Sequence, residues 1–418
     1  MLLSSLGVRR RAFLALAGAV LVSAGGIAPP AEAQDVRSRQ WYLDAMKADD
    51  MWKVSQGEGV TVAVVDTGVD ASLPELKGQV LQGADVSANP KNPREDPDGH
   101  GTNMAALIAG NGASGGIQGL APKARILPVR NDANGRDDDP DVIQDKAIRY
   151  AVDHGARVIN ISSGTIALSR QFPLTQAAVK YALKKGSLVF AATGNNGDEH
   201  NGISQPAGIP GVVGVAAIDG DGKVAKWSTH GDQVALSAVG VDIITYCTKS
   251  KGLCKSWGTS QATALASASA ALIWAKHPKW NNNQVLRVMM QTASKPTTGE
   301  IPSSYVGYGS VRPRKVLLDG EGDPGPANVN PLLAREGATK PDPSASASAS
   351  KSPSTDPKST PTATDDQKGD KKTVAEPKKN DDNSSTLWIA IGVGVAVLLA
   401  AAVAIVLVRR RGSASVGL

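Results

Sequence analysis

Five short apolar runs between residues 60 and 216 each predict a β-strand. They cover residues 60–65, 126–129, 158–161, 188–191 and 212–216. Helical patterns separate or follow them over residues 102–109, 140–154, 174–185 and 260–276. Strands that alternate with helices indicate a mostly parallel sheet covered on both faces, and strands buried on both sides should be nearly all apolar, as these are. The pattern therefore predicts a three-layer α/β domain, with chemistry at the carboxyl ends of its strands.

The C-terminal part has two other patterns. Residues 323–385 are rich in Pro, Ser, Thr, Lys and Asp and contain no aromatic residue, which predicts a disordered linker. Residues 387–408 carry no charge, and as a helix they would extend roughly 33 Å, enough to cross a bilayer. Three arginines begin the basic tail, residues 409–418, so we expect this tail to be cytoplasmic. A buried core helix is the alternative for residues 387–408.

The N-terminal residues 1–33 have the pattern of a secretory signal. Three arginines at positions 9–11 precede a short apolar run over residues 12–22, and Ala31-Glu32-Ala33 is a small-x-small cleavage site. The arginine pair before Phe13 also fits a twin-arginine signal, so both export routes stay open. We expect an extension over residues 34–54, a folded domain over 55–322 outside a bacterial plasma membrane, and a single span.

Two cysteines, Cys247 and Cys254, are the only ones in the chain. They are close in sequence in an exported domain, which predicts a disulfide that closes a small hairpin; two free buried thiols are the alternative. No paired His or second Cys pair accompanies them, so no metal site is predicted there. The net charge of +6 is spread unevenly and indicates no nucleic-acid partner.

Acidic loop residues raise the question of calcium. Their spacing does not resemble a calcium loop, so we interpret them as solvated carboxylates and predict neither a metal nor a cofactor. These residues are Asp85, Asp96, Asp98 and the run Asp137 to Asp139.

Three Gly-rich segments carry candidate catalytic residues. Asp66 ends a strand pattern, His100 lies in Gly-His-Gly-Thr, and Ser260 lies in Gly-Thr-Ser at the start of a helix pattern. A Ser hydroxyl needs a base within hydrogen-bond reach, and that base needs an orienting partner. Asp66 alone would be a turn residue or helix cap, and Ser260 alone an N-cap. Their joint occurrence in the order Asp, His, Ser predicts a catalytic triad for acyl transfer.

Asn195 is the candidate donor to the oxyanion of the transition state. It follows the buried run 188–191 in Thr-Gly-Asn-Asn-Gly, and an amide side chain placed there can donate to developing negative charge. Asn196 is the nearest competitor. A plain Asn-Asn-Gly turn is the alternative for the whole segment.

Taken together, these segments resemble the subtilisin-like serine proteases, family S8. The matching segments are Val65-Asp66-Thr67-Gly68, His100-Gly101-Thr102, Ile159 to Gly164, Ala192-Thr193-Gly194-Asn195, Pro206-Ala207 and Gly258-Thr259-Ser260. The resemblance implies the subtilisin fold and a polypeptide substrate lying along an edge formed by Ser162, Ser163 and Gly164. It also implies a pocket wall formed by Ala191, Ala192, Thr193 and Gly194, and a cis peptide before Pro206.

The domain arrangement resembles the mycosins, the membrane-anchored proteases of bacterial type VII secretion. That resemblance implies an N-terminal extension wrapped on the domain and association with the secretion membrane complex. Two alternatives stay open: a domain that acts mainly as a structural stabiliser or cap of that complex, and a general surface protease.

Three residues depart from the usual family motifs. Ala264 stands where a Pro is usual after the nucleophile, followed by Leu265, and Met104 and Ala106 replace Val and Gly after the His. None is a proton-transfer group, so these changes concern helix packing and pocket shape.

Overall fold

A seven-stranded parallel sheet forms the centre of the computed structural model, which describes residues 36–131, 139–166, 171–248 and 252–334. Its strand order is β2-β3-β1-β4-β6-β8-β9, and every ladder between neighbours is parallel. The strands are β1 Thr61–Asp66, β2 Ala84–Asp85, β3 Arg125–Arg130, β4 Val158–Ile161, β6 Leu188–Ala192, β8 Val213–Ile218 and β9 Val234–Val239. The five predicted strands are all present, and β2 and β9 extend the sheet at its two edges.

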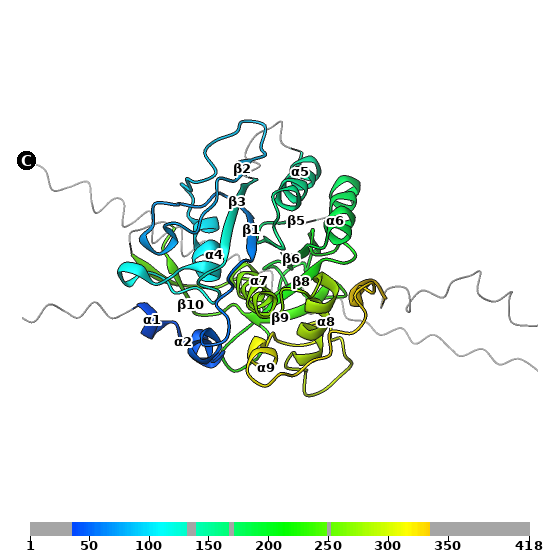
Figure 1. Cartoon of the computed structure of the whole chain (residues 1–418). Coiled ribbons are helices and arrows are strands. Elements are labelled where there is room, and N and C mark those ends of the chain that lie inside the picture. The colour runs from blue at the N-terminus through cyan, green and yellow to red at the C-terminus, as the bar shows by residue number, and fades with distance from the viewer. Residues whose placement is uncertain (1–35, 132–138, 167–170, 249–251, 335–418) are drawn as a thin grey trace, which may run out of the picture. The chain divides into compact units, whose positions relative to one another are not determined.

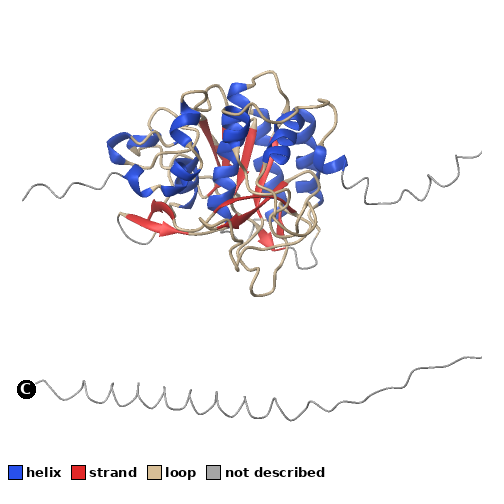
Figure 2. Ribbon diagram, turned by 90° about the horizontal axis from the view of Figure 1, so that it is seen from below, coloured by secondary structure: helices blue, strands red, loops and turns tan. Residues whose placement is uncertain are grey.

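Helices cover both faces of this sheet (Figures 1 and 2). Alternate residues of β1 point to opposite faces, so Ala63 and Val65 pack with α5 and α6, while Val62 and Val64 pack with α4 and α7. Burial on both faces explains why the strands are almost wholly apolar. The covering helices are α4 His100–Ala109, α5 Pro140–Asp153, α6 Pro173–Lys185 and α7 Thr259–Lys276.

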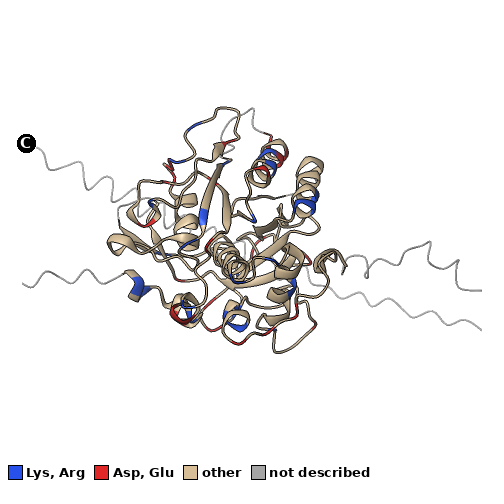
Figure 3. Cartoon of the chain, viewed as in Figure 1, with Lys and Arg blue, Asp and Glu red and all other residues tan. Residues whose placement is uncertain are grey.

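Helix α7 is the central element of one layer. Every residue from Thr259 to Trp274 is buried, and small Ala and Ser side chains let the helix lie close to five strands of the sheet. Charged residues instead lie on outer helices such as α5 and α6 (Figure 3). This arrangement matters for function because the first turn of α7 carries Ser260.

The chain changes direction across the sheet between β1 and β4. From β1 it proceeds to β2 and β3 on one side, then continues with β4, β6, β8 and β9 on the other side. In open α/β sheets, the crevice at such a switch point, outside the carboxyl ends of the strands, is where ligands bind. Asp66 ends β1 and Ser162 follows β4, so two predicted site segments lie at this point.

The N-terminal extension is part of the folded domain. Its helices place Tyr42, Leu43 and Met51 in the same hydrophobic core as α4 and α7, with 0% of each side chain exposed. Trp52 Nε1 also donates to the Leu120 carbonyl at 2.8 Å. The helices are α1 Val36–Arg39, α2 Trp41–Ala45 and α3 Ala48–Trp52.

Short elements complete the domain. Two pairs of short strands are antiparallel: β5 with β7, and β10 with β11, of which the second pair is a hairpin. The remaining elements are η1 Pro74–Leu76, η2 Ala113–Gly115, β5 Thr165–Ile166, β7 Ser204–Gln205, β10 Ile243–Tyr246, β11 Leu253–Ser256, α8 Asn282–Thr292 and α9 Pro313–Leu317.

The folded domain continues beyond residue 322, the end that the sequence predicts. Arg287 on α8 donates to the carbonyls of Pro326 at 3.0 Å and Val329 at 2.6 Å, and Leu332 is buried. Residues 323–334 therefore lie on the domain rather than in the predicted linker. The rest of that linker, the signal and the predicted span 387–408 lie outside the described residues. Among the residues that are described, no helix is both long enough and apolar enough to cross a membrane.

Candidate active site

Asp66 and His100 form the best-defined pair of the site. Asp66 is the last residue of β1 and His100 the first of α4, and His100 Nδ1 lies 2.7 Å from Asp66 Oδ1. The Asp66 side chain is 1% exposed and that of His100 33% exposed. Gly101 allows this approach, because a Cβ there would lie 2.2 Å from the Gly68 carbonyl oxygen. The pair therefore leaves one edge of the imidazole open to solvent.

Side chains in the loops before α4 satisfy the first N–H groups of that helix. Asp98 accepts from the His100 N–H at 3.1 Å, Thr67 Oγ1 from Gly101 at 3.0 Å, and Asp96 from Thr102 at 2.8 Å. Thr67 Oγ1 also donates to Asp96 at 2.8 Å. Negative side chains at a helix N-terminus complement the helix dipole, so this network fixes the start of α4 and with it the imidazole.

The surrounding carboxylates change the protonation of His100. The negative charge of Asp66 raises the pKa of His100 to about 9, the hydrogen bond to Asp66 and the charges of Asp98 and Asp96 add to this effect, and burial opposes it. The resting imidazole is therefore largely protonated at neutral pH.

Ser260 lies in the first turn of α7 and is 8% exposed. Its hydroxyl donates to the backbone carbonyl of Ser162 at 3.0 Å, and within the described ranges it makes no hydrogen bond to His100. The structure thus brings Ser260 to the end of β4. Helix α4, which carries His100, packs directly against α7.

Asn195 is held by the same first turn of α7. Its Oδ1 accepts from the N–H and the hydroxyl of Thr259, each at 2.9 Å. Asn195 is exposed, and with its Oδ1 fixed its Nδ2 remains available as a donor beside the early N–H groups of α7, which have no partner within the helix. Asn196 instead has both ends engaged, by Thr229 at 2.6 Å and His200 at 2.8 Å. The contacts favour Asn195 over Asn196 as an oxyanion donor.

The segment Ser162, Ser163 and Gly164 forms an open edge after β4. In the described parts of the chain, none of its backbone N–H or C=O groups pairs with another backbone group. Ser162 is buried, Ser163 is half-buried and Gly164 is exposed. Beside this edge lies a cavity of about 220 Å³ whose lining includes Ser163, Gly164, Gln144 and Gln205. An extended peptide can pair with such an edge and place a side chain in the cavity.

Two residues predicted to form the pocket wall lie in the core instead. Ala191 and Thr193 are 0% exposed, and the Thr193 hydroxyl donates to the Val215 carbonyl at 3.2 Å. They are therefore too deep to contact a substrate, because β6 runs through the middle of the sheet. Ala192 retains 8% exposure and Gly194 is half-buried, so these two remain available to a wall.

A disulfide-closed hairpin connects α4 and α7. Cys247 and Cys254 are joined, with their Cα atoms 5.2 Å apart, next to the paired strands β10 and β11. Asn103 on α4 binds the Tyr246 backbone through two hydrogen bonds, of 2.9 and 2.8 Å. The hairpin then leads through Trp257 into α7.

The peptide bond between Gln205 and Pro206 is cis.

One acidic residue differs from the expectation of a solvated carboxylate. The Asp85 side chain is 1% exposed and lies 3.4 Å from Arg130 Nε, so it is a buried ion pair that joins β2 to β3. Asp139 caps α5, and Asp96 and Asp98 cap α4. Asp137 and Asp138 lie outside the described residues. No group of three or more possible metal ligands occurs in the described ranges.

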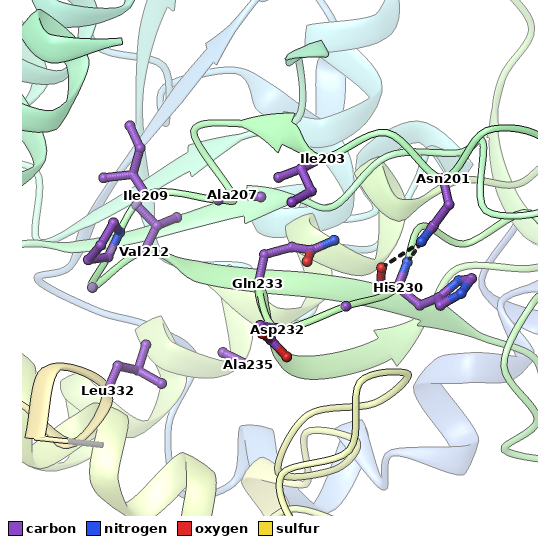
Figure 4. Close-up of a pocket in the computed structure, with 14 residues that line it drawn as sticks. Asn201, Ile203, Ala207, Ile209, Val212, His230, Asp232, Gln233, Ala235 and Leu332 are labelled. Atoms are coloured by element: carbon purple, nitrogen blue, oxygen red, sulfur yellow. Dashed lines mark hydrogen bonds between the residues drawn. The ribbon is translucent and has the colours of Figure 1, made fainter. Parts of the chain in front are cut away.

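A larger cavity, of about 600 Å³, lies away from these residues (Figure 4). It is bordered by residues 201–212 and 230–235 and by Leu332, and none of the predicted site residues lines it. Asn201 and His230 exchange two hydrogen bonds of 2.9 Å at one end. Because none of the predicted site residues lines this cavity, we do not assign the reaction to it although it is the larger of the two.

Comparison with known proteins assigns the chain to a family. Residues 57–309 match the subtilase family, Peptidase_S8. The chain belongs to this family. The thermophilic serine proteinase of Bacillus sp. (strain AK1) is 38% identical over 268 residues, which is 63% of this chain and 63% of that protein. Thermitase of Thermoactinomyces vulgaris is 37% identical over 239 residues, covering 56% of this chain and 82% of thermitase.

Solved structures confirm the subtilisin-like fold and the resemblance to mycosins. A serine protease, MycP1, described as an essential component of the type VII (ESX-1) secretion system, is 30% identical with a TM-score of 0.61, covering 69% of this chain and 90% of MycP1. The MycP3 protease of the ESX-3 system is 31% identical with a TM-score of 0.58, covering 66% and 87%. The chain spans only 63% of the length of its Bacillus relative.

The departures from the family motifs fall in the core. Met104, Ala106 and Ala264, with the adjoining Leu265, are each 0% exposed. Helix α7 runs without interruption through Ala264, whose backbone keeps the N–H that a Pro would lack. These residues therefore affect packing behind the site rather than its polar groups.

Proposed function

We propose that this chain is a serine endopeptidase in which Asp66, His100 and Ser260 form the catalytic triad. The observation that carries the proposal is the distance of 2.7 Å between Asp66 Oδ1 and His100 Nδ1 at the start of α4. Helix α4 packs against α7, whose first turn carries Ser260. Membership of the subtilase family supports the same assignment.

The reaction begins with a rotation of the Ser260 side chain from the Ser162 carbonyl toward His100. Neutral His100 then takes the hydroxyl proton as Ser260 attacks the scissile carbonyl, and Asp66 stabilises the imidazolium. Asn195 Nδ2 and the N–H groups at the start of α7 stabilise the oxyanion. His100 returns its proton to the leaving amine, and water hydrolyses the acyl-enzyme by the same steps.

The proposed substrate is an extended polypeptide. Residues 162–164, which make no backbone–backbone hydrogen bond in the described structure, offer hydrogen bonds to a peptide backbone irrespective of its side chains. Ala192 and Gly194 supply the opposite wall of the cleft.

The proposed location is the outer face of a bacterial plasma membrane. This rests on the sequence of residues 1–33 and 387–411. Likeness to MycP1 and MycP3, whose descriptions place them in type VII secretion systems, supports a role at such a secretion complex.

Labelling of the full-length chain with a serine-directed phosphonate tests the proposal, with Ser260→Ala as the matched control. We expect the wild type to be labelled and Ser260→Ala to fold without being labelled, because that change deletes one hydroxyl. Absence of label on the folded wild type would overturn the assembled active site. It would leave a structural role in the secretion complex as the better interpretation.

A further inference from the structure

Asn160 is an unusual residue for its position. It lies in the middle of β4, between Val64 of β1 and Phe190 of β6, and it is 0% exposed. The other strand positions around it are apolar. A buried amide is costly unless its hydrogen-bonding groups are satisfied, so its partners show what it holds in place.

The Asn160 side chain connects α7 to the substrate edge. Ser267, on α7 and 0% exposed, donates to Asn160 Oδ1 at 3.1 Å. Asn160 Nδ2 donates to Ser162 Oγ at 3.0 Å, and Ser162 Oγ donates to the backbone carbonyl of Ser260 at 3.3 Å. The Ser260 hydroxyl in turn donates to the Ser162 carbonyl at 3.0 Å.

This chain of hydrogen bonds ties together two parts of the site that come from different elements of the fold. Ser260 belongs to the first turn of α7, and Ser162 to the segment after β4, nearly a hundred residues away. The position of an extended substrate is set by the segment after β4, whereas the nucleophile is set by α7. Their relative placement controls whether the attacking oxygen reaches the scissile carbonyl, and small misplacements reduce rates strongly.

We infer that Asn160 and Ser267 are positioning residues that fix the distance between the substrate-binding edge and the nucleophile. This inference rests on the proposed function. Neither residue touches the substrate or the reacting atoms. Both act through Ser162, whose backbone and side chain meet Ser260.

The test compares two serines of the same helix. Ser267→Ala removes the donor to Asn160, whereas Ser269→Ala removes an equally buried hydroxyl that donates only to the Leu265 carbonyl of its own helix at 2.8 Å. Full-length chains are labelled with the phosphonate well below their unfolding temperatures, and the rates are expressed per folded protein. We expect Ser267→Ala to lower the maximal labelling rate constant about tenfold with little change in the concentration for half-maximal rate. Ser269→Ala should label like the wild type.

A second variant keeps the inference testable if Ser267→Ala folds poorly. Ser162→Ala breaks the same chain at its other end and should lower the labelling rate in the same way. The double variant should be no slower than the slower single variant, because both changes break the same chain of hydrogen bonds. If the wild type is labelled and Ser267→Ala and Ser269→Ala are labelled at equal rates, the positioning role is refuted. The proposed function would still stand. Additive losses in the double variant would refute it as well, since unconnected damage adds.

Discussion

The Ser260 hydroxyl donates to the Ser162 carbonyl at 3.0 Å, so the resting nucleophile is directed at the substrate edge instead of at His100. In the proposed pairing of a peptide with residues 162–164, the substrate residue whose carbonyl faces Ser260 would donate its own N–H to the same Ser162 oxygen. The substrate N–H and the Ser260 hydroxyl therefore compete for one acceptor, so substrate binding should release the nucleophile. Backbone pairing should accordingly affect the chemical step as well as affinity.

Methylation of a single substrate nitrogen tests this competition. In a peptide substrate, N-methylation of the residue that carries the scissile carbonyl removes the N–H that replaces the Ser260 hydroxyl at Ser162. We expect kcat to fall about fivefold, the effect of losing roughly one hydrogen bond. The control peptide is methylated one residue earlier, where the N–H of an extended strand points away from the edge. Equal effects of the two methyl groups on kcat would contradict the competition.

The pH dependence of activity follows from the His100 pKa of about 9. Catalysis needs neutral His100, so kcat/KM should rise with pH and approach its plateau only above pH 9. Asp66→Asn removes the charge that raises this pKa. We expect its ascending limb to shift toward about pH 6.5, the ordinary range of an imidazole, while kcat falls by about 10⁴. If kcat/KM of the wild type instead rose around pH 6.5, Asp66 would not stabilise the protonated form of His100.

The same pair makes stability depend on pH in the opposite direction. The His100 pKa is higher in the folded than in the unfolded chain, so the protonated pair stabilises the fold. This contribution is complete below about pH 6.5 and is lost as pH rises through about 9. As pH rises through this window, the midpoint temperature of thermal unfolding should therefore fall more for the wild type than for His100→Gln. Parallel pH curves for the two proteins would exclude the coupling.

Asn195 should matter through its donor rather than through its contact with α7. Asn195→Ala removes both, and we expect kcat to fall by about 10² to 10³. Asn195→Asp keeps an acceptor for the Thr259 N–H but removes the donor, so it should be equally or more impaired while unfolding at a temperature near that of the wild type. Asn196→Ala serves as the control and should retain most of its activity. Near-normal kcat for Asn195→Asp would show that Asn195 only caps the helix.

Much of the sheet was predictable because buried parallel strands leave a clear signal. The runs at 60–65 and 158–161 give β1 and β4 within a residue of their bounds, and the nucleophile helix α7 begins one residue before Ser260. The start of helix α8 is also marked in the sequence, since Asn281 and Gln284 form a capping box. Strand β9 is an apolar run of the same kind as the five that were used.

Contacts between distant segments could not be predicted in this way. The burial of Ala191 and Thr193 depends on where β6 lies in the sheet, and the pairing of Asp85 with Arg130 depends on β2 lying beside β3. Asn160 looks like any polar residue in a strand until Ser267 is brought next to it. Sequence patterns locate elements along the chain, whereas these roles arise from neighbours that only the topology supplies.

Removal of the predicted membrane span gives a test that is independent of the active site. The described residues end at 334, so a stop codon in place of Leu387 removes none of them. We expect the truncated chain to appear in the medium and to react with the phosphonate at the wild-type rate, while the full-length chain stays in washed membranes. A truncated chain that persisted in washed membranes would show that the N-terminal segment or the domain itself provides the anchor.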